Sequence, residues 1–237
     1  MKPFLTAQWR DLAMLNWPID PALLAPRVPA GTELDLWSGA CYVSLVAFRF
    51  LDTRVRGLAI PGHRDFEEIN LRFYVRRRAA GEERRGVVFI KEIVPRFAIA
   101  FVARTLYEEP YVALPTSSAV RDAGAGRSAR YEWREGGRAH WVALDCAGPA
   151  RSLAAGSRES FIAEHYWGYT ARRAGGASEY RVAHPAWSAR DASRIEISAD
   201  FARLYGPELS RVLSVPPEFS FLAEGSAVEV YPGERLR

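Results

Sequence analysis

The segment FEEINLRFYVRRR, residues 66–78, most constrains the fold of this chain, because apolar and polar residues alternate strictly from position 69 to position 76. The apolar residues Ile69, Leu71 and Phe73 are separated by the polar residues Asn70 and Arg72. A period of two residues is typical of a β-strand whose two faces meet different surroundings. The apolar face must cover a core, whereas the polar face looks either at water or into an enclosed pocket. The second orientation would make this strand part of a binding site.

Segments with strand character recur along the chain and are punctuated by glycine and proline. Residues 66–78 and 86–96 are joined by the charged stretch RRRAAGEERR and are expected to pair antiparallel. Further strand patterns lie at 40–50, 129–133, 138–145 and 178–184, and a closing hairpin is expected at 218–232. No linker or internal repeat divides the chain. We therefore expect one mainly β, barrel-like domain over residues 1–237, built from roughly ten strands.

Short peripheral helices, roughly three or four of them, are expected around these strands. Asp20 and Ser157 each precede a helical pattern and are suited to cap it. A further short helix, broken at Gly206–Pro207, is expected within residues 199–213. Residues 97–106 have apolar side chains at helical spacing, and Pro110 ends that pattern.

The charge balance indicates which partners this chain would bind. Its 32 basic and 28 acidic residues give a net charge of +4, which does not indicate a nucleic-acid surface. The arginines at 76–78 are interpreted as a solvated hairpin end, with phosphate binding as the alternative. The sequence has neither a signal-peptide core nor an apolar run of about 18 residues, so we expect a cytoplasmic protein without a membrane partner. The expected partner is a small molecule, and homo-oligomerisation stays open.

Lys91 is the first candidate for covalent chemistry. In GVVFIKEIVPR, strict alternation places Lys91 on the same face as Val87 and Phe89. Apolar neighbours lower the pKa of an ammonium group, and the neutral amine can attack a carbonyl. In the alternative interpretation, the long stem of Lys91 crosses apolar surface and its charge reaches water or pairs with Glu67 or Glu68.

The polar face of the 66–78 strand supplies the candidate ligand-binding residues Asn70, Arg72 and Tyr74. The planar fork of Arg72 suits a carboxylate, and Asn70 offers both a donor and an acceptor. If that face looks at water, these residues only solubilise the sheet. His63, in the preceding loop, is a further candidate because an imidazole can act as acid or base, or it is simply solvated.

Several sequence motifs are absent, and their absence narrows the function classes. We find no phosphate-binding loop, dinucleotide glycine fingerprint or nucleophile-elbow serine in the sequence. The pair Glu164–His165 lacks the second ligand at helical spacing that a zinc protease motif has. We therefore expect neither a cofactor nor a metal ion.

Long stretches of the chain resemble the uncharacterised YqjF-like family, a domain of unknown function. They are FLTAQWRDLAMLNWPID, VPAGTELDLWSGACYVSLVAFRF, RGLAIPGHRDFEEINLRFYVRR, RRGVVFIKEIVPR, ARTLYEEPY, FIAEHYWGYT and VAHPAW. That family is grouped with the acetoacetate decarboxylase-like fold, so the resemblance implies a β-barrel with an interior cavity and a few peripheral helices. In the decarboxylases an active-site lysine beside a second lysine forms a Schiff base with a β-keto acid. Here Lys91 is the internal lysine, and Glu92 follows it.

Two functions remain open from the sequence. In the first, the barrel binds a small organic acid or carbonyl compound and acts as a decarboxylase-like lyase, with Lys91 as nucleophile, Arg72 as carboxylate anchor and Glu67 or Glu68 as proton carrier. In the second, the chain is a non-catalytic ligand-binding or interaction module that keeps the fold without the chemistry. A purely structural protein would instead have a filled interior.

Overall fold

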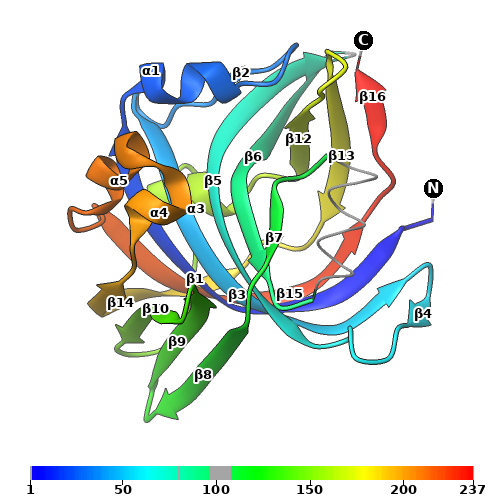
Figure 1. The fold of residues 1–237 in the computed structure, drawn as a ribbon. Coiled ribbons are helices and arrows are strands. Elements are labelled where there is room, and N and C mark those ends of the chain that lie inside the picture. Colours follow the sequence, from blue (N-terminus) through cyan, green and yellow to red (C-terminus); the bar gives the residue numbers. More distant parts are fainter. Residues whose placement is uncertain (1, 80, 97–107, 237) are drawn as a thin grey trace.

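The computed structural model of this chain describes residues 2–79, 81–96 and 108–236 (Figure 1). The helix expected at residues 97–106 lies outside the described residues. Four short α-helices are described: α1 (Pro21–Leu24), α3 (Arg158–Ala163), α4 (Phe201–Tyr205) and α5 (Pro207–Leu213). Asp20 caps α1 and Ser157 caps α3, as the sequence predicts. Most of the remaining described residues are in strands, so the expectation of a mainly β fold is confirmed.

The long strands form a ring (Figure 1). In order around the ring they are β1 (Leu5–Ile19), β3 (Cys41–Val55), β5 (Phe66–Ala79), β6 (Glu82–Val94), β12 (Trp167–Ala171), β13 (Ala177–Ala183) and β15 (Phe219–Val230). Strand β13 pairs with both β12 and β15, and this second pairing closes the ring. A closed ring has no unpaired edge and encloses an interior that side chains fill or leave hollow.

A second layer covers one side of the ring. Strands β8 (Thr116–Ala123), β9 (Gly126–Glu135), β10 (Arg138–Cys146) and β14 (Ser188–Ser198) continue the sheet from β15. The remaining strands are short: β2 (Glu33–Leu34), β4 (Leu58–Ala59), β7 (Tyr111–Ala113), β11 (Arg151–Ser152) and β16 (Glu234–Leu236). Figure 1 shows α4 and α5 beside the outer surface of β3 and β5, above β9 and β10.

Five of the ring strands, β1, β3, β5, β6 and β15, contribute to two apolar clusters, one on each face. Along β5, Leu71 and Phe73 belong to the outer cluster, together with Tyr131 and Trp133 of β9 and Leu204 of α4. The inner cluster contains other members of the ring strands, among them Met14, Val46, Phe48, Tyr74 and Val87. Burial on both faces explains why 40–50 reads as a nearly continuous apolar run.

A β-bulge in β6 changes which residues face the interior. Phe89 pairs with Arg72 and Lys91 pairs with Leu71, so Ile90 is an extra residue between two consecutive pairs. One inserted residue reverses the alternation beyond it. Phe89 faces the interior, and on the far side of the bulge Glu92 takes the inward position while Lys91 faces outward.

The predicted closing hairpin at 218–232 is wrong, because β15 runs as one strand through this segment. Gly225 does not reverse the chain. Its φ is +76°, and a Cβ there would lie 2.1 Å from the carbonyl oxygen of Trp9 on β1. The glycine therefore lets two strand backbones approach closely.

Among the described residues, none of the helices has the length and apolar character needed to cross a lipid bilayer.

Candidate functional site

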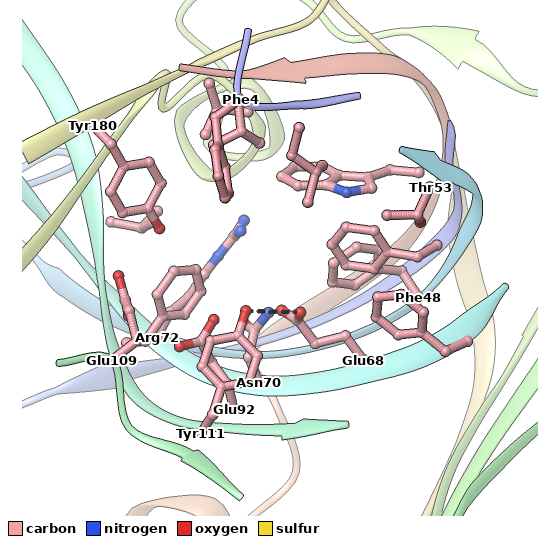
Figure 2. Close-up of a pocket in the computed structure, with 18 of the residues that line it drawn as sticks. Phe4, Phe48, Thr53, Glu68, Asn70, Arg72, Glu92, Glu109, Tyr111 and Tyr180 are labelled. Atoms are coloured by element: carbon pink, nitrogen blue, oxygen red, sulfur yellow. Dashed lines mark hydrogen bonds between the residues drawn. The ribbon is translucent and has the colours of Figure 1, made fainter. Parts of the chain in front are cut away.

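The ring encloses a cavity of about 420 Å³ (Figure 2). Most of its wall is apolar and includes Leu12, Phe48, Phe50, Phe66 and Phe89. Its polar lining residues include Glu68, Asn70, Arg72, Glu92, Glu109, Tyr111, His165 and Tyr180. An apolar cavity with a small set of convergent polar groups is the usual form of a small-molecule site.

The polar face of β5 looks into this cavity. Glu68, Asn70 and Arg72 occupy successive inward positions of the strand and line the cavity wall. Their exposed fractions are 3%, 1% and 9%, so all three are largely buried. Tyr74, the next residue on that face, is buried behind the lining and donates a hydrogen bond of 2.6 Å to Ser44 Oγ.

Arg72 holds a positive charge in the cavity without a carboxylate bound to it. One terminal nitrogen donates to the carbonyl oxygen of Ile162 at 3.4 Å, and the guanidinium lies 5.7 Å from the ring centroid of Tyr74. Among the described residues, Arg72 forms no ion pair and its Nε has no hydrogen-bond partner. Figure 2 shows the side chain extending into the open space. A buried, unpaired guanidinium is costly, so this arrangement favours an anion beside it.

Three carboxyl groups gather near Arg72 in the same cavity. Glu68 accepts hydrogen bonds from Asn70 Nδ2 at 2.9 Å and from the Tyr111 hydroxyl at 3.2 Å. Glu109 accepts one from Thr170 Oγ1 at 2.7 Å and lies within hydrogen-bonding reach of Glu92. Strand pairing produces this cluster, because Glu92 on β6 lies opposite Asn70 on one side and Tyr111 of β7 on the other.

Burial favours the protonated form of each carboxyl group in this cluster. It raises the pKa of Glu68 to about 7, with a further contribution from the nearby charge of Glu109. Burial also raises the pKa of Glu92 well above its usual value, reinforced by Glu109 and Glu68, and raises that of Glu109. A carboxyl group that is neutral at pH 7 can donate a hydrogen bond to a ligand oxygen, and one that titrates near pH 7 can exchange protons.

A buried histidine forms a separate polar group on the wall. His165 Nε2 lies 3.1 Å from Asp35 Oδ2, which also accepts a 2.7 Å hydrogen bond from Arg85 Nε. Burial lowers the pKa of His165 to about 4, so its ring is neutral at pH 7. With its ring 4.6 Å from that of Tyr74, His165 supports the far end of the β5 face.

Lys91 does not line the cavity, and the prediction that it shares a face with Val87 and Phe89 is wrong because of the β6 bulge. Its ammonium donates to the carbonyl oxygen of Leu204 on α4, outside the ring, and lies 5.6 Å from the ring centroid of Tyr205. Burial lowers the pKa of Lys91. The apolar surroundings that the sequence predicts for Lys91 are therefore present, but they lie on the opposite side of the sheet from the cavity.

The other predicted residues are divided between the two sides of β5. Glu67 points outward, where Thr116 Oγ1 and Ser118 Oγ each donate to it at 2.9 Å, whereas Glu68 points inward. His63 is half-buried on the cavity wall, with its Nδ1 2.9 Å from the carbonyl oxygen of Pro61. The structure thus brings His63, Glu68, Asn70 and Arg72 to one cavity and leaves Glu67, Tyr74 and Lys91 outside its lining.

Glu92, Glu109, Tyr111 and Tyr180 were not among the predicted site residues. One usable signal was Glu92 itself, an acidic residue within the apolar run IKEIV. The others come from β7, β13 and the segment before β7, and they meet only because the ring closes. No local pattern in the sequence marks such a convergence.

Comparison with known proteins relates most of the chain to one family. A family model, DUF2071, described as an uncharacterized conserved protein, matches residues 6–227. The uncharacterized protein YqjF of Bacillus subtilis (strain 168) is 34% identical over 104 residues, which are 44% of this chain and 41% of that protein. The match thus spans less than half the length of that relative.

Solved structures with the same fold are distant in sequence. Acetoacetate decarboxylase from Legionella pneumophila is 14% identical with a TM-score of 0.65, and the match covers 100% of this chain and 88% of that one. The enduracididine biosynthesis enzyme MppR, complexed with pyruvate, is 12% identical with a TM-score of 0.68, covering 100% and 92%. An acetoacetate decarboxylase-like enzyme from Sphingomonas wittichii RW1 is 15% identical with a TM-score of 0.65, covering 100% and 94%. The acetoacetate decarboxylase-like fold expected from the sequence is confirmed.

Proposed function

This chain belongs to the DUF2071 family of uncharacterized conserved proteins. We propose that it binds a short organic acid carrying a carbonyl group in the ring cavity. The observation that carries the proposal is Arg72, a buried cation with no carboxylate partner among the described residues. The guanidinium would hold the ligand carboxylate through charge-assisted hydrogen bonds. A protonated carboxyl group of the cluster would donate a hydrogen bond to the carbonyl oxygen of the ligand.

Cavity size and wall chemistry support a small ligand of this kind. A volume of about 420 Å³ accommodates a compact molecule, and the aromatic wall suits a short hydrocarbon part. MppR, which shares the fold, has been solved with pyruvate, an oxo acid of this class. The purely structural alternative predicts a filled interior, which does not agree with this cavity.

Calorimetric titration with pyruvate, acetate and acetone tests the proposal at pH 6.5. Acetate keeps the carboxylate and acetone keeps the carbonyl, so each comparator removes one of the two anchoring groups. We expect pyruvate or a longer oxo acid to bind more tightly than either comparator. The proposal would be overturned if no oxo acid of two to six carbons gave a saturable heat of binding, so that the oxo acids behaved like acetate and acetone.

Schiff-base chemistry is not part of this proposal, because neither lysine of the chain, Lys2 or Lys91, lines the cavity. Borohydride treatment in the presence of pyruvate or acetoacetate should therefore leave the intact mass of the protein unchanged. Mass spectrometry checks this, with a known Schiff-base enzyme as positive control.

Lys91→Ala provides the matched variant for this prediction. We expect it to retain the oxo-acid affinity of the wild type, because Lys91 contacts α4 and not the cavity. A stoichiometric adduct on Lys91, or loss of binding in the folded variant, would show that this lysine reaches the ligand.

A further inference from the structure

We propose that Glu68 is a general base that removes a proton from the carbon next to the carbonyl group of the bound oxo acid, with Glu92 as the acid on the carbonyl oxygen. This inference rests on the proposed function and adds a reaction to it. The reaction is reversible enolisation, and it uses carboxyl groups where a Schiff-base enzyme would use an amine.

The geometry separates the two carboxyl groups by role. Glu68 accepts from Asn70 at 2.9 Å and from Tyr111 at 3.2 Å, and both donors are neutral groups that stabilise a carboxylate. Because each carboxylate oxygen has two lone pairs, both oxygens can still accept a proton. The donors fix the orientation of the carboxylate toward the cavity without neutralising it.

Glu92 stands on the adjacent strand, directly opposite Asn70, and is 1% exposed. Its nearest charged neighbours are the carboxyl groups of Glu109 and Glu68, and no cation pairs with it among the described residues. Two neighbouring carboxyl groups in a buried site do not both ionise readily, so one keeps its proton. Glu92, with the least support for a charge, is the one that remains an acid.

Arg72 sets the position of the substrate relative to this pair. Residues 68, 70 and 72 are successive inward positions, so Glu68 and Arg72 are separated by about 13 Å along the strand backbone. Their long side chains extend into the same cavity and shorten that gap (Figure 2). A short oxo acid whose carboxylate lies on Arg72 would direct its carbonyl and adjacent carbon toward Glu68 and Glu92.

The step balances without a cofactor or co-reactant. The Glu68 carboxylate takes the proton, and the electron pair of the broken C–H bond forms a C=C bond. The π electrons of the carbonyl move to its oxygen, which receives the proton of Glu92. The product is an enol. Once the proton held by Glu68 has exchanged with solvent, the reverse steps restore the oxo acid with a solvent-derived proton on carbon and regenerate the Glu68 carboxylate and the Glu92 acid.

Proton NMR in D₂O tests this directly with pyruvate, whose methyl protons are next to the carbonyl. We expect the protein to speed loss of the methyl signal above the rate in matched buffer. Glu68→Gln should lower the protein-dependent rate by at least ~100-fold, as expected for a general base, while calorimetry still detects pyruvate binding. Glu67→Gln, altered at the adjacent outward-facing carboxyl, is the matched control and should keep the rate.

Each outcome is decisive. If the wild type binds pyruvate but does not accelerate exchange, the general-base inference fails and the binding proposal stands. If no oxo acid binds, the binding proposal and the general-base inference both fail. Should Glu68→Gln not fold, Glu68→Asp replaces it, because withdrawing the carboxylate by one methylene should also slow exchange; an unchanged rate in a folded Glu68 variant overturns the inference.

Discussion

Arg72→Gln should weaken the binding of pyruvate or a related oxo acid by about 100-fold, the largest loss of affinity that we expect from a single change in the cavity. A hydrogen bond to a charged group is worth about 1.5–3 kcal/mol, and a guanidinium offers two such bonds to one carboxylate. Glutamine keeps a polar group of similar reach but carries no charge. Isothermal titration calorimetry of wild type and variant at pH 6.5 measures the difference.

Arg78→Gln is the control for this prediction. Arg78 lies on the same strand, but it is exposed and does not line the cavity. Its replacement should leave the affinity within twofold of the wild-type value, since a surface charge contributes little at physiological salt. An equal loss of affinity in both variants would point to nonspecific attraction of anions by the arginine-rich chain. Unchanged affinity in a folded Arg72→Gln protein would remove the carboxylate anchor from the account.

Glu68→Gln should stabilise the folded protein at pH 8 by about 2 kcal/mol more than it does at pH 5. Burial raises the pKa of Glu68 from 4.5 to about 7 in the folded state. The stability that comes from this raised pKa is fully present below about pH 4.5 and is lost as the pH rises through 7. Glutamine does not titrate, so the stability of the variant does not fall in this way as the pH rises.

The difference between variant and wild type is the quantity to measure, by urea unfolding at both pH values. His165 gives the wild type an opposite slope, because burial lowers its pKa from 6.5 to about 4 and the resulting stability is lost as the pH falls through 4. Both proteins contain His165, so its contribution cancels in the difference. A difference that is the same at pH 5 and pH 8 would mean that Glu68 titrates in water in the folded protein.

Alternation along β5 predicted the face that matters for the site. Asn70 and Arg72 were assigned to one side of a strand from a period of two residues, and both line the cavity in the structure. The alternation was sufficient to place Asn70 and Arg72 on the same face because β5 runs without interruption through these positions. Whether that side looked inward could not be read from the strand alone, since the answer depends on closure of the ring by β13 and β15.

The same reasoning gave the wrong side for Lys91, because alternation assumes an unbroken register. The extra residue Ile90 reverses the orientation of the side chains beyond it, and nothing in GVVFIKEIVPR marks a bulge. The bulge brings Glu92 into the cavity in place of the lysine. The cavity therefore contains a carboxyl group at this position because of the way β5 and β6 pair, and the pairing register cannot be predicted from the residue types alone.

Both proposals depend on seclusion of the polar side of β5 from water inside the ring. A carbon-13 NMR titration of the glutamate side-chain carboxyls tests it most directly, with the Glu68 signal assigned by its disappearance in Glu68→Gln. We expect a titration midpoint near 7 for this carboxyl. A midpoint near the ordinary value of 4.5 would instead place Glu68 in water and rule out a secluded site.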